Sequence, residues 1–189
     1  LDDIAGDALN IPANAIIKSN DNGLVYTLRT NNDQFRLDKS NSNFIYVPVI
    51  QGKYEDQTLT STGESFQSFN VITKGMIDHD QIRVTVNSNL WSKYDSLYDM
   101  KKGTQGYIVK TGITGGLDLY FGNGSFGEIP EKGASIKVEY LKISGSMGNL
   151  NGRADLTFKF ETEGTDSLGN THDLNELSEL YGMSRKEVT

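Results

Sequence analysis

The sequence predicts a mainly β fold, a sandwich-like module of short antiparallel strands with one or two short helices, α+β overall. Glycine, tyrosine and phenylalanine are frequent, at 20, 9 and 8 residues of 189. Asn, Ser, Thr and Asp separate short apolar runs, several of which alternate between apolar and polar side chains. Alternation is the period of a half-buried strand, and many short strands with polar turns are typical of a sandwich or barrel.

Composition excludes several classes of protein. A formal net charge of -7 disfavours a broad nucleic-acid surface, because neutralising phosphates requires clustered Lys and Arg. The absence of cysteine removes disulfides, thiolate metal sites and cysteine nucleophiles. No apolar run approaches the roughly 20 residues of a spanning helix, so we expect no membrane insertion. The chain starts without Met or a signal peptide, which predicts a fragment or a processed chain.

In the N-terminal part we expect an irregular arm over residues 1–14, followed by four strands. The segment 24–28 shows clean alternation, and residues 19–23 supply a turn before it. The run 44–50 is apolar on both faces, which predicts a central strand with Pro48 at an edge or strand end. The four predicted strands cover residues 16–17, 24–28, 35–37 and 44–50.

The middle of the chain predicts further strands and one helical segment. Residues 78–80 (Asp-His-Asp) read as a polar tip, and apolar residues between 90 and 98 recur at helical spacing. The polar segment around residues 58–62 fits an edge strand. The other predicted strands cover residues 66–72, 82–86 and 107–111.

Residues 117–141 contain two alternating runs around a glycine-rich middle, with GNGSFG at 122–127. This is literally G-x-G-x-x-G, the pattern of phosphate-binding loops. A dinucleotide loop, however, needs a helix after its last glycines, and Pro130 and Gly133 argue against one. A kinase loop needs H-R-D and D-F-G motifs, which the chain lacks.

A structural role explains these glycines better. We expect Gly122 and Gly124 to adopt backbone angles closed to other residues, so that the chain reverses after the first strand. Residues 129–132 suit a type I turn with Gly133 at positive φ. The remaining expectation concerns packing: Leu117, Leu119 and Phe121 face the same core as Ile136 and Val138, and Phe126 with Ile129 plugs its end.

The C-terminal part predicts a glycine-rich crossing loop at 144–152, a strand at 154–160 and a polar run. Asp173 and Glu176 form a capping box for a helix over 174–181, which Gly182 ends. A second helix is expected to begin at Ser184. We therefore expect a β-rich domain over 1–150 and a strand, linker and helix over 151–189, with docking on neighbours through Leu174, Leu177 and Tyr181.

Other candidate sites are weaker. His79 between Asp78 and Asp80 suggests a metal or acid–base cluster, but a solvated turn is the commoner arrangement. The acidic segment 166–173 lacks the ligand pattern of a calcium loop. A cluster of Trp91, Tyr94 and Tyr98 suggests an aromatic platform for sugars, although core or interface packing is more frequent. No catalytic, metal or cofactor residue is expected, and no small-molecule substrate.

Residues 120–140, YFGNGSFGEIPEKGASIKVEY, followed by GSMGN at 145–149, carry a family resemblance. They resemble the baseplate J-like proteins, particularly baseplate wedge subunits of contractile-tailed, T4-like phages. The shared pattern is an aromatic residue, F-G-[DN]-G-x-x-G-x-x-P, a turn ending in glycine, a strand ending in Tyr, then G-x-x-G-N. Upstream, Ile11-Pro12, residues 49–54 and Trp91 also fit, so the resemblance covers residues 11–150.

The resemblance implies a structural virion protein of the tail baseplate, assembled in the host cytoplasm and without enzymatic activity. Its partners would be copies of itself and other wedge proteins, which form a sixfold ring whose rearrangement helps to trigger sheath contraction. Two alternatives stay open: a glycan-binding β-sandwich and a nucleotide-binding enzyme. The motif residues implied to shape the fold are Phe121, Gly122, Gly124, Gly127, Pro130, Gly133 and Tyr140.

Overall fold

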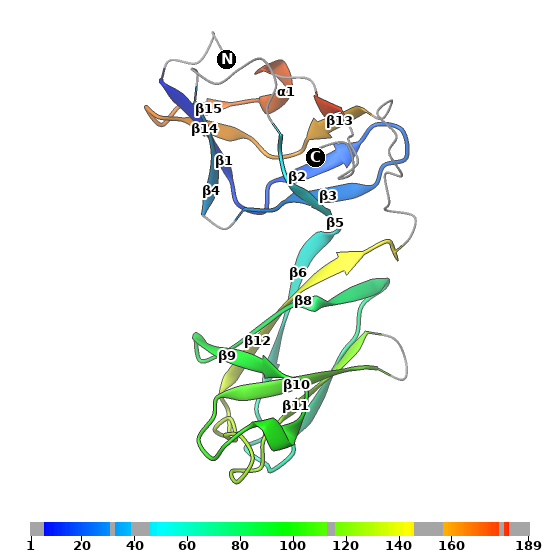
Figure 1. Ribbon diagram of the computed structural model, residues 1–189, viewed down its shortest axis with the longest axis vertical. Helices are drawn as coiled ribbons and strands as arrows, with labels where there is room; N and C mark the ends of the chain where they lie inside the picture. Colours follow the sequence, from blue (N-terminus) through cyan, green and yellow to red (C-terminus); the bar gives the residue numbers. More distant parts are fainter. Residues whose placement is uncertain are drawn as a thin grey trace. The chain divides into compact units, whose positions relative to one another are not determined.

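The computed structural model describes residues 6–30, 33–38, 46–112, 116–145, 157–177 and 180–181. Strands dominate this part of the chain, with one short α-helix near the C-terminus and one 3₁₀ turn (Figure 1). The predicted mainly β fold is therefore confirmed.

The chain forms two compact units. Unit 1 comprises Leu1–Lys53 together with Ser144–Thr189, and unit 2 comprises Tyr54–Ile143. Unit 2 is thus inserted into the sequence of unit 1, which differs from the expected division at residue 150. The physical reason is strand pairing between distant segments, since strands from the C-terminal part pair with strands from the N-terminal part. Local periodicity carries no information about such partners.

Unit 1 contains two sheets around one core. The orders are β15-β14-β1-β4 and β16-β13-β2-β3-β5. Leu9, Ile11, Ile17, Leu28 and Phe160 pack together in the buried core. The strands and the helix are β1 (Ala8–Pro12), β2 (Ile16–Ser19), β3 (Val25–Leu28), β4 (Gln34–Asp38), β5 (Val49–Gln51), β13 (Thr157–Phe160), β14 (Gly164–Asp166), β15 (Thr171–His172), α1 (Leu174–Leu177) and β16 (Leu180–Tyr181).

Two expectations for the N-terminal part are wrong. The predicted irregular arm contains β1, which lies between β4 and β14 and buries Leu9 and Ile11. In the described part of the predicted central strand at 44–50, only Val49 and Ile50 belong to a strand, β5 at a sheet edge, and Tyr46 and Val49 are exposed. Pro48 lies immediately before β5, at the strand end that its missing N–H allows, as the sequence predicted.

The predicted helix over 174–181 is a single turn. Asp173 caps it as expected, since its Oδ1 accepts a hydrogen bond of 2.9 Å from the Asn175 N–H. The chain is again extended at Leu180–Tyr181, which pairs with Thr157 and Phe158. Pairing with β13 therefore replaces the end of the predicted helix. The second helix predicted at Ser184 lies outside the described residues.

Unit 2 is one seven-stranded sheet, in the order β6-β12-β8-β9-β10-β11-β7. The pairs β12/β8, β8/β9, β10/β11 and β11/β7 are antiparallel, and the pair β9/β10 is parallel. Side chains from all seven strands pack into one core, so the sheet curls around it. The elements are β6 (Lys53–Thr60), β7 (Ser68–Val71), β8 (Met76–Val86), β9 (Asn89–Tyr94), η1 (Leu97–Asp99), β10 (Gly106–Thr111), β11 (Leu117–Phe121) and β12 (Ser135–Ile143).

The polar tip predicted at 78–80 is wrong, because these residues belong to the long strand β8. Ile82 lies opposite Tyr140 and Asp78 lies opposite Leu141, so residues 79–81 leave the ladder as a β-bulge. A bulge lets three polar residues sit within a strand, since none of them needs a partner across the sheet.

The helix predicted between 90 and 98 is also wrong for most of its length. Residues 89–94 form β9, with Leu90 exposed and Trp91 buried, and only Leu97–Asp99 makes a 3₁₀ turn. Asn87 and Ser88 both have positive φ, 47° and 68°, as the two-residue type I′ hairpin between β8 and β9 requires. The hairpin therefore holds residues 89–94 in an extended conformation, although their apolar residues are spaced as in a helix.

Candidate interaction surface at the loop end of unit 2

The glycine-rich loop 122–134 joins β11 to β12 across one end of the curled sheet. These strands are not neighbours, because β8, β9 and β10 lie between them in the sheet. The loop therefore does not reverse the chain between two adjacent strands, as expected, but crosses the open end of the curled sheet. Residues after Gly127 form no helix, so the loop lacks the helix N-terminus that holds a pyrophosphate in dinucleotide sites.

Two glycines of this loop are required for different reasons. Gly124 has φ +87°, as predicted, and this region is costly for residues with a Cβ. Gly122 does not have positive φ, contrary to expectation. A Cβ there would instead overlap the Phe126 carbonyl oxygen and the main chain of Gly127. The loop folds back tightly over Gly122, with the Gly124 N–H donating to the Gly127 carbonyl at 2.9 Å.

Main-chain hydrogen bonds tie this loop to the neighbouring loops 61–67 and 95–105. The Gly127 and Glu128 N–H groups donate to the carbonyls of Lys101 and Thr104, at 3.2 and 2.8 Å. On the other side, the Phe66 N–H donates to the Gly122 carbonyl at 3.1 Å. Three loops from distant parts of unit 2 therefore form one hydrogen-bonded frame.

A buried polar cluster fixes the second half of the loop. Ser61 and Gln67 are 3% and 6% exposed, and the Ser61 hydroxyl lies 2.8 Å from the Pro130 carbonyl. The Gln67 Nε2 group donates to the same carbonyl at 3.4 Å. These contacts hold Pro130 before the turn, so the turn lies at 131–134 and not at 129–132 as predicted. Gly133 has the expected positive φ, 84°.

Three aromatic residues of the predicted sites are core residues. Phe121 is fully buried and packs edge-on against Trp91, with ring centroids 5.4 Å apart. Trp91 is only 4% exposed, so it packs in the core, the arrangement that the sequence favoured, and offers no open ring face for the alternative sugar platform with Tyr94 and Tyr98. Tyr140, the aromatic residue that ends the motif, is also buried in this core.

Three other aromatic side chains are exposed on the loop frame. They are Phe66, Tyr98 and Phe126, at 54%, 81% and 40% exposure, and we call them the aromatic tip. Tyr98 and Phe126 pack edge-on with centroids 5.5 Å apart. The expectation that Phe126 plugs the core is therefore wrong. Phe66 has φ +57°, an unfavourable conformation for a bulky residue.

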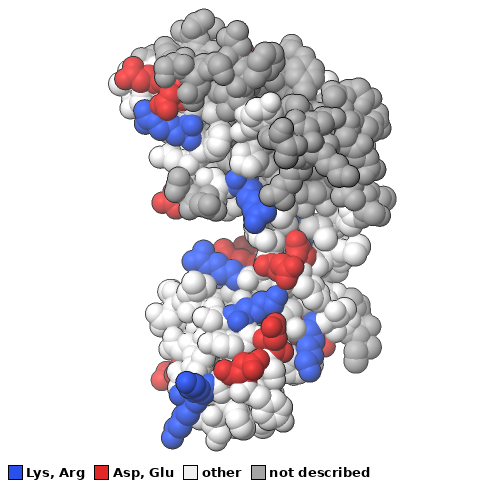
Figure 2. All heavy atoms as spheres, in the orientation of Figure 1, with Lys and Arg blue, Asp and Glu red and all other residues white. Residues whose placement is uncertain are grey.

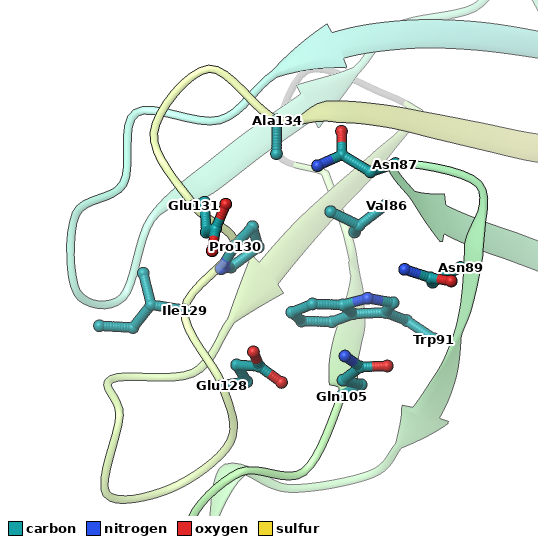
Figure 3. A pocket seen from close by; sticks show the side chains of 10 residues that line it. All are labelled: Val86, Asn87, Asn89, Trp91, Gln105, Glu128, Ile129, Pro130, Glu131 and Ala134. Carbon is teal, nitrogen blue, oxygen red and sulfur yellow. The ribbon is translucent and has the colours of Figure 1, made fainter.

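Beside this frame lies a hollow of about 190 Å³, floored by Trp91 (Figure 3). Its polar lining consists of two carboxylates and three amides, from Glu128, Glu131, Asn87, Asn89 and Gln105. Sequence reasoning missed this set, because the residues come from three separate segments and none forms a motif. The remaining lining is apolar, from Val86, Ile129, Pro130 and Ala134.

The other predicted site residues do not join this region. Leu174 is buried in the unit 1 core, so its predicted docking role is wrong. The side chains of Leu177 and Tyr181 lie outside what the structure describes. His79 lies in the β8 bulge, where its carbonyl accepts a 2.6 Å hydrogen bond from Lys93 Nζ. Among the described residues, no group of three His, Asp or Glu is placed to hold a metal ion.

Buried titratable groups have structural roles. In unit 1, the fully buried Asp166 carboxylate lies 3.0 Å from His172 Nε2 and from Asn170 Nδ2, and also accepts main-chain N–H groups. These contacts, above all that with His172, hold the pKa of Asp166 well below its usual range. In unit 2, burial raises the pKa of Tyr107 to about 12. Its hydroxyl donates to the Ile82 carbonyl at 3.0 Å, beside the bulge.

In comparisons with known proteins, no family model, no curated protein and no solved structure matches the chain. In the described part of the chain, no helix is long and apolar enough to cross a membrane. Figure 2 shows basic and acidic side chains interspersed on the visible face of unit 2, with no extended patch of one sign.

Proposed function

We propose that the protein is a structural assembly subunit, a component of the baseplate wedge of a contractile phage tail. The observation that supports this best is the aromatic tip. Three loops held by main-chain hydrogen bonds present three exposed aromatic rings at one end of unit 2. Aromatic side chains are enriched among the anchors of protein interfaces.

The conformation of Phe66 supports a role in contacts. A left-handed backbone costs a residue with a side chain about 1–2 kcal/mol. Strain of this kind persists where the surrounding structure imposes it, and it is concentrated at functional sites. Here the Phe66 N–H is fixed by the Gly122 carbonyl, and the ring remains 54% exposed. The folded unit therefore keeps the apolar Phe66 ring exposed to solvent, although burial of the ring would be energetically favourable.

The baseplate assignment is supported by the motif itself. Its residues shape the loop that carries the tip: Phe121 anchors the loop in the core, Gly122 allows its fold-back, and Pro130 is held by Ser61. None of these roles involves a ligand. The motif that resembles baseplate J-like proteins is thus the motif that builds the proposed contact surface.

The rival functions have less support. A phosphate-binding loop would require a helix after the glycines, and a strand follows instead. A glycan platform would require an open Trp91 face, and this ring is buried against Phe121. We therefore propose no enzymatic activity, and assembly with copies of itself and other wedge proteins in the virion.

The test is association of the purified chain with itself and with phage tail proteins. The double variant Tyr98→Ser and Phe126→Ser should lose assemblies seen by electron microscopy and analytical ultracentrifugation. Ile72→Ser is the matched control, because Ile72 is 65% exposed and follows the β7 end remote from Phe121. If the wild type, the double variant and Ile72→Ser assemble equally, the aromatic tip is not an assembly surface.

A further inference from the structure

We propose that the hollow beside Trp91 receives the side chain of an arginine from a partner chain. The partner's role as a neighbour in the assembly rests on the proposed function, but the chemistry of the hollow is argued from its own residues. The hollow belongs entirely to unit 2 and lies beside the loop that carries the aromatic tip.

The charge of the lining selects a cation. Glu128 and Glu131 both line the hollow, and no Lys, Arg or His does. Within the described residues, neither carboxylate forms an ion pair, whereas Glu55, Glu139 and Glu161 each pair with a lysine. The chain as a whole carries a net charge of -7, so a basic partner is electrostatically complementary.

An unpaired donor at the floor gives a second, independent indication of a ligand. Trp91 is 4% exposed, and its indole N–H has no hydrogen-bond partner within the described part of the chain. Its nitrogen is not among the fully buried atoms that lack a partner, so this donor is accessible to a ligand. Figure 3 shows the indole nitrogen on the ring edge towards Asn87 and Asn89, within the hollow. This donor calls for an acceptor, such as a main-chain carbonyl of the incoming segment.

The amides complete a site for a planar, multidentate group. The Asn87 Oδ1 atom accepts the Ser135 N–H at 2.9 Å, which leaves its NH₂ group for a ligand. Asn89 and Gln105 add further donors and acceptors from β9 and the segment before β10. Guanidinium carries five donors in a fixed plane and can bind two carboxylates at once. Lysine offers a point charge, and a sugar would lack an open aromatic face on which to stack.

The experiment is a titration of the whole 189-residue chain with N-acetyl-arginine amide, followed by ¹H–¹⁵N correlation spectra. We expect saturable shifts of the Trp91 indole signal and of the Asn87, Asn89 and Gln105 side-chain amides. N-acetyl-citrulline amide, which has the same shape without the charge, is the matched probe and should bind weakly. Glu128→Gln and Glu131→Gln should each weaken arginine binding about twofold to fivefold, the range for an exposed ion pair.

Equal shifts with the arginine and citrulline probes, or none with either, would overturn the proposal, as would stronger binding of N-acetylglucosamine. Wild-type protein alone decides this comparison, so an unfolded variant would not prevent a result. The assembly experiment is read separately. Assembly of the protein without arginine binding would refute only the proposal for the hollow. Arginine binding without assembly would refute only the proposed function.

Discussion

Replacing Gly122 with alanine should destabilise unit 2 more than replacing Gly124, although only Gly124 has positive φ. At Gly122 the new Cβ would overlap the Phe126 carbonyl and the Gly127 main chain, which cannot rotate away as a side chain can. At Gly124 the new Cβ would meet only Ile129 Cδ1, at an ordinary contact distance of 3.6 Å. The first substitution is therefore a steric problem and the second a conformational one.

The magnitudes follow from these contacts. Relieving the overlap at Gly122 breaks two hydrogen bonds across the loop, Asn123 N–H to Phe126 O and Gly124 N–H to Gly127 O. At about 0.5–1.5 kcal/mol each, with about 1–3 kcal/mol for overpacking, the loss is about 2–6 kcal/mol. Left-handed alanine at Gly124 costs about 1–2 kcal/mol. Each kcal/mol lowers the Tm of a unit of this size by about 4–8 °C.

The assay is urea and thermal unfolding followed by tryptophan fluorescence. Trp91 is the only tryptophan of the chain and packs against Phe121, so its emission reports unit 2 alone. Gly133→Ala is the matched control, because Gly133 has φ +84° and open space around its Cα. It should lose about as much stability as Gly124→Ala.

The result that would refute this reasoning is equal unfolding free energy for Gly122→Ala and Gly124→Ala. It would mean that the loop can open over Gly122 without cost. The hydrogen-bonded frame of three loops would then not be rigid, and the support for a preformed contact surface would be lost.

Three further outcomes are expected. Asp166→Asn should destabilise unit 1 at neutral pH. Because the fold lowers the pKa of Asp166, its contribution is present above the unfolded value of about 4 and is lost as pH falls below it, which far-UV circular dichroism of wild type and variant would compare. Tyr107→Phe should cost about 1 kcal/mol and remove the tyrosine that ionises near pH 12 in an ultraviolet titration. Phe66→Gly should raise the Tm by relieving positive φ while lowering association, whereas a loss of stability would contradict the strain argument.

Alternation of apolar and polar residues predicted the strands of this protein well where one face of the strand is buried and the other is more exposed. β11 and β12 are examples, since Leu117, Leu119 and Phe121 face the core with Ile136 and Val138, as expected. Turn chemistry was similarly local, and Gly124 and Gly133 have the predicted positive φ. These features depend on residues within a few positions of one another.

Features that depend on distant partners were not predictable. β1 has little periodicity and becomes a strand because β4 and β14 flank it. The helical spacing of apolar residues around Trp91 gave a wrong prediction of a helix, because the hairpin at Asn87 holds the chain extended. The insertion of unit 2 into unit 1 and the meeting of Gln105 with Glu128 arise only from the tertiary fold.

The most direct test of the central claim is electron microscopy of the protein reconstituted with phage baseplate proteins. We expect wedges that close into a ring of sixfold symmetry, with Phe66, Tyr98 and Phe126 buried against a neighbouring subunit. Particles that lack this chain, or a ring in which those three side chains face solvent, would contradict it.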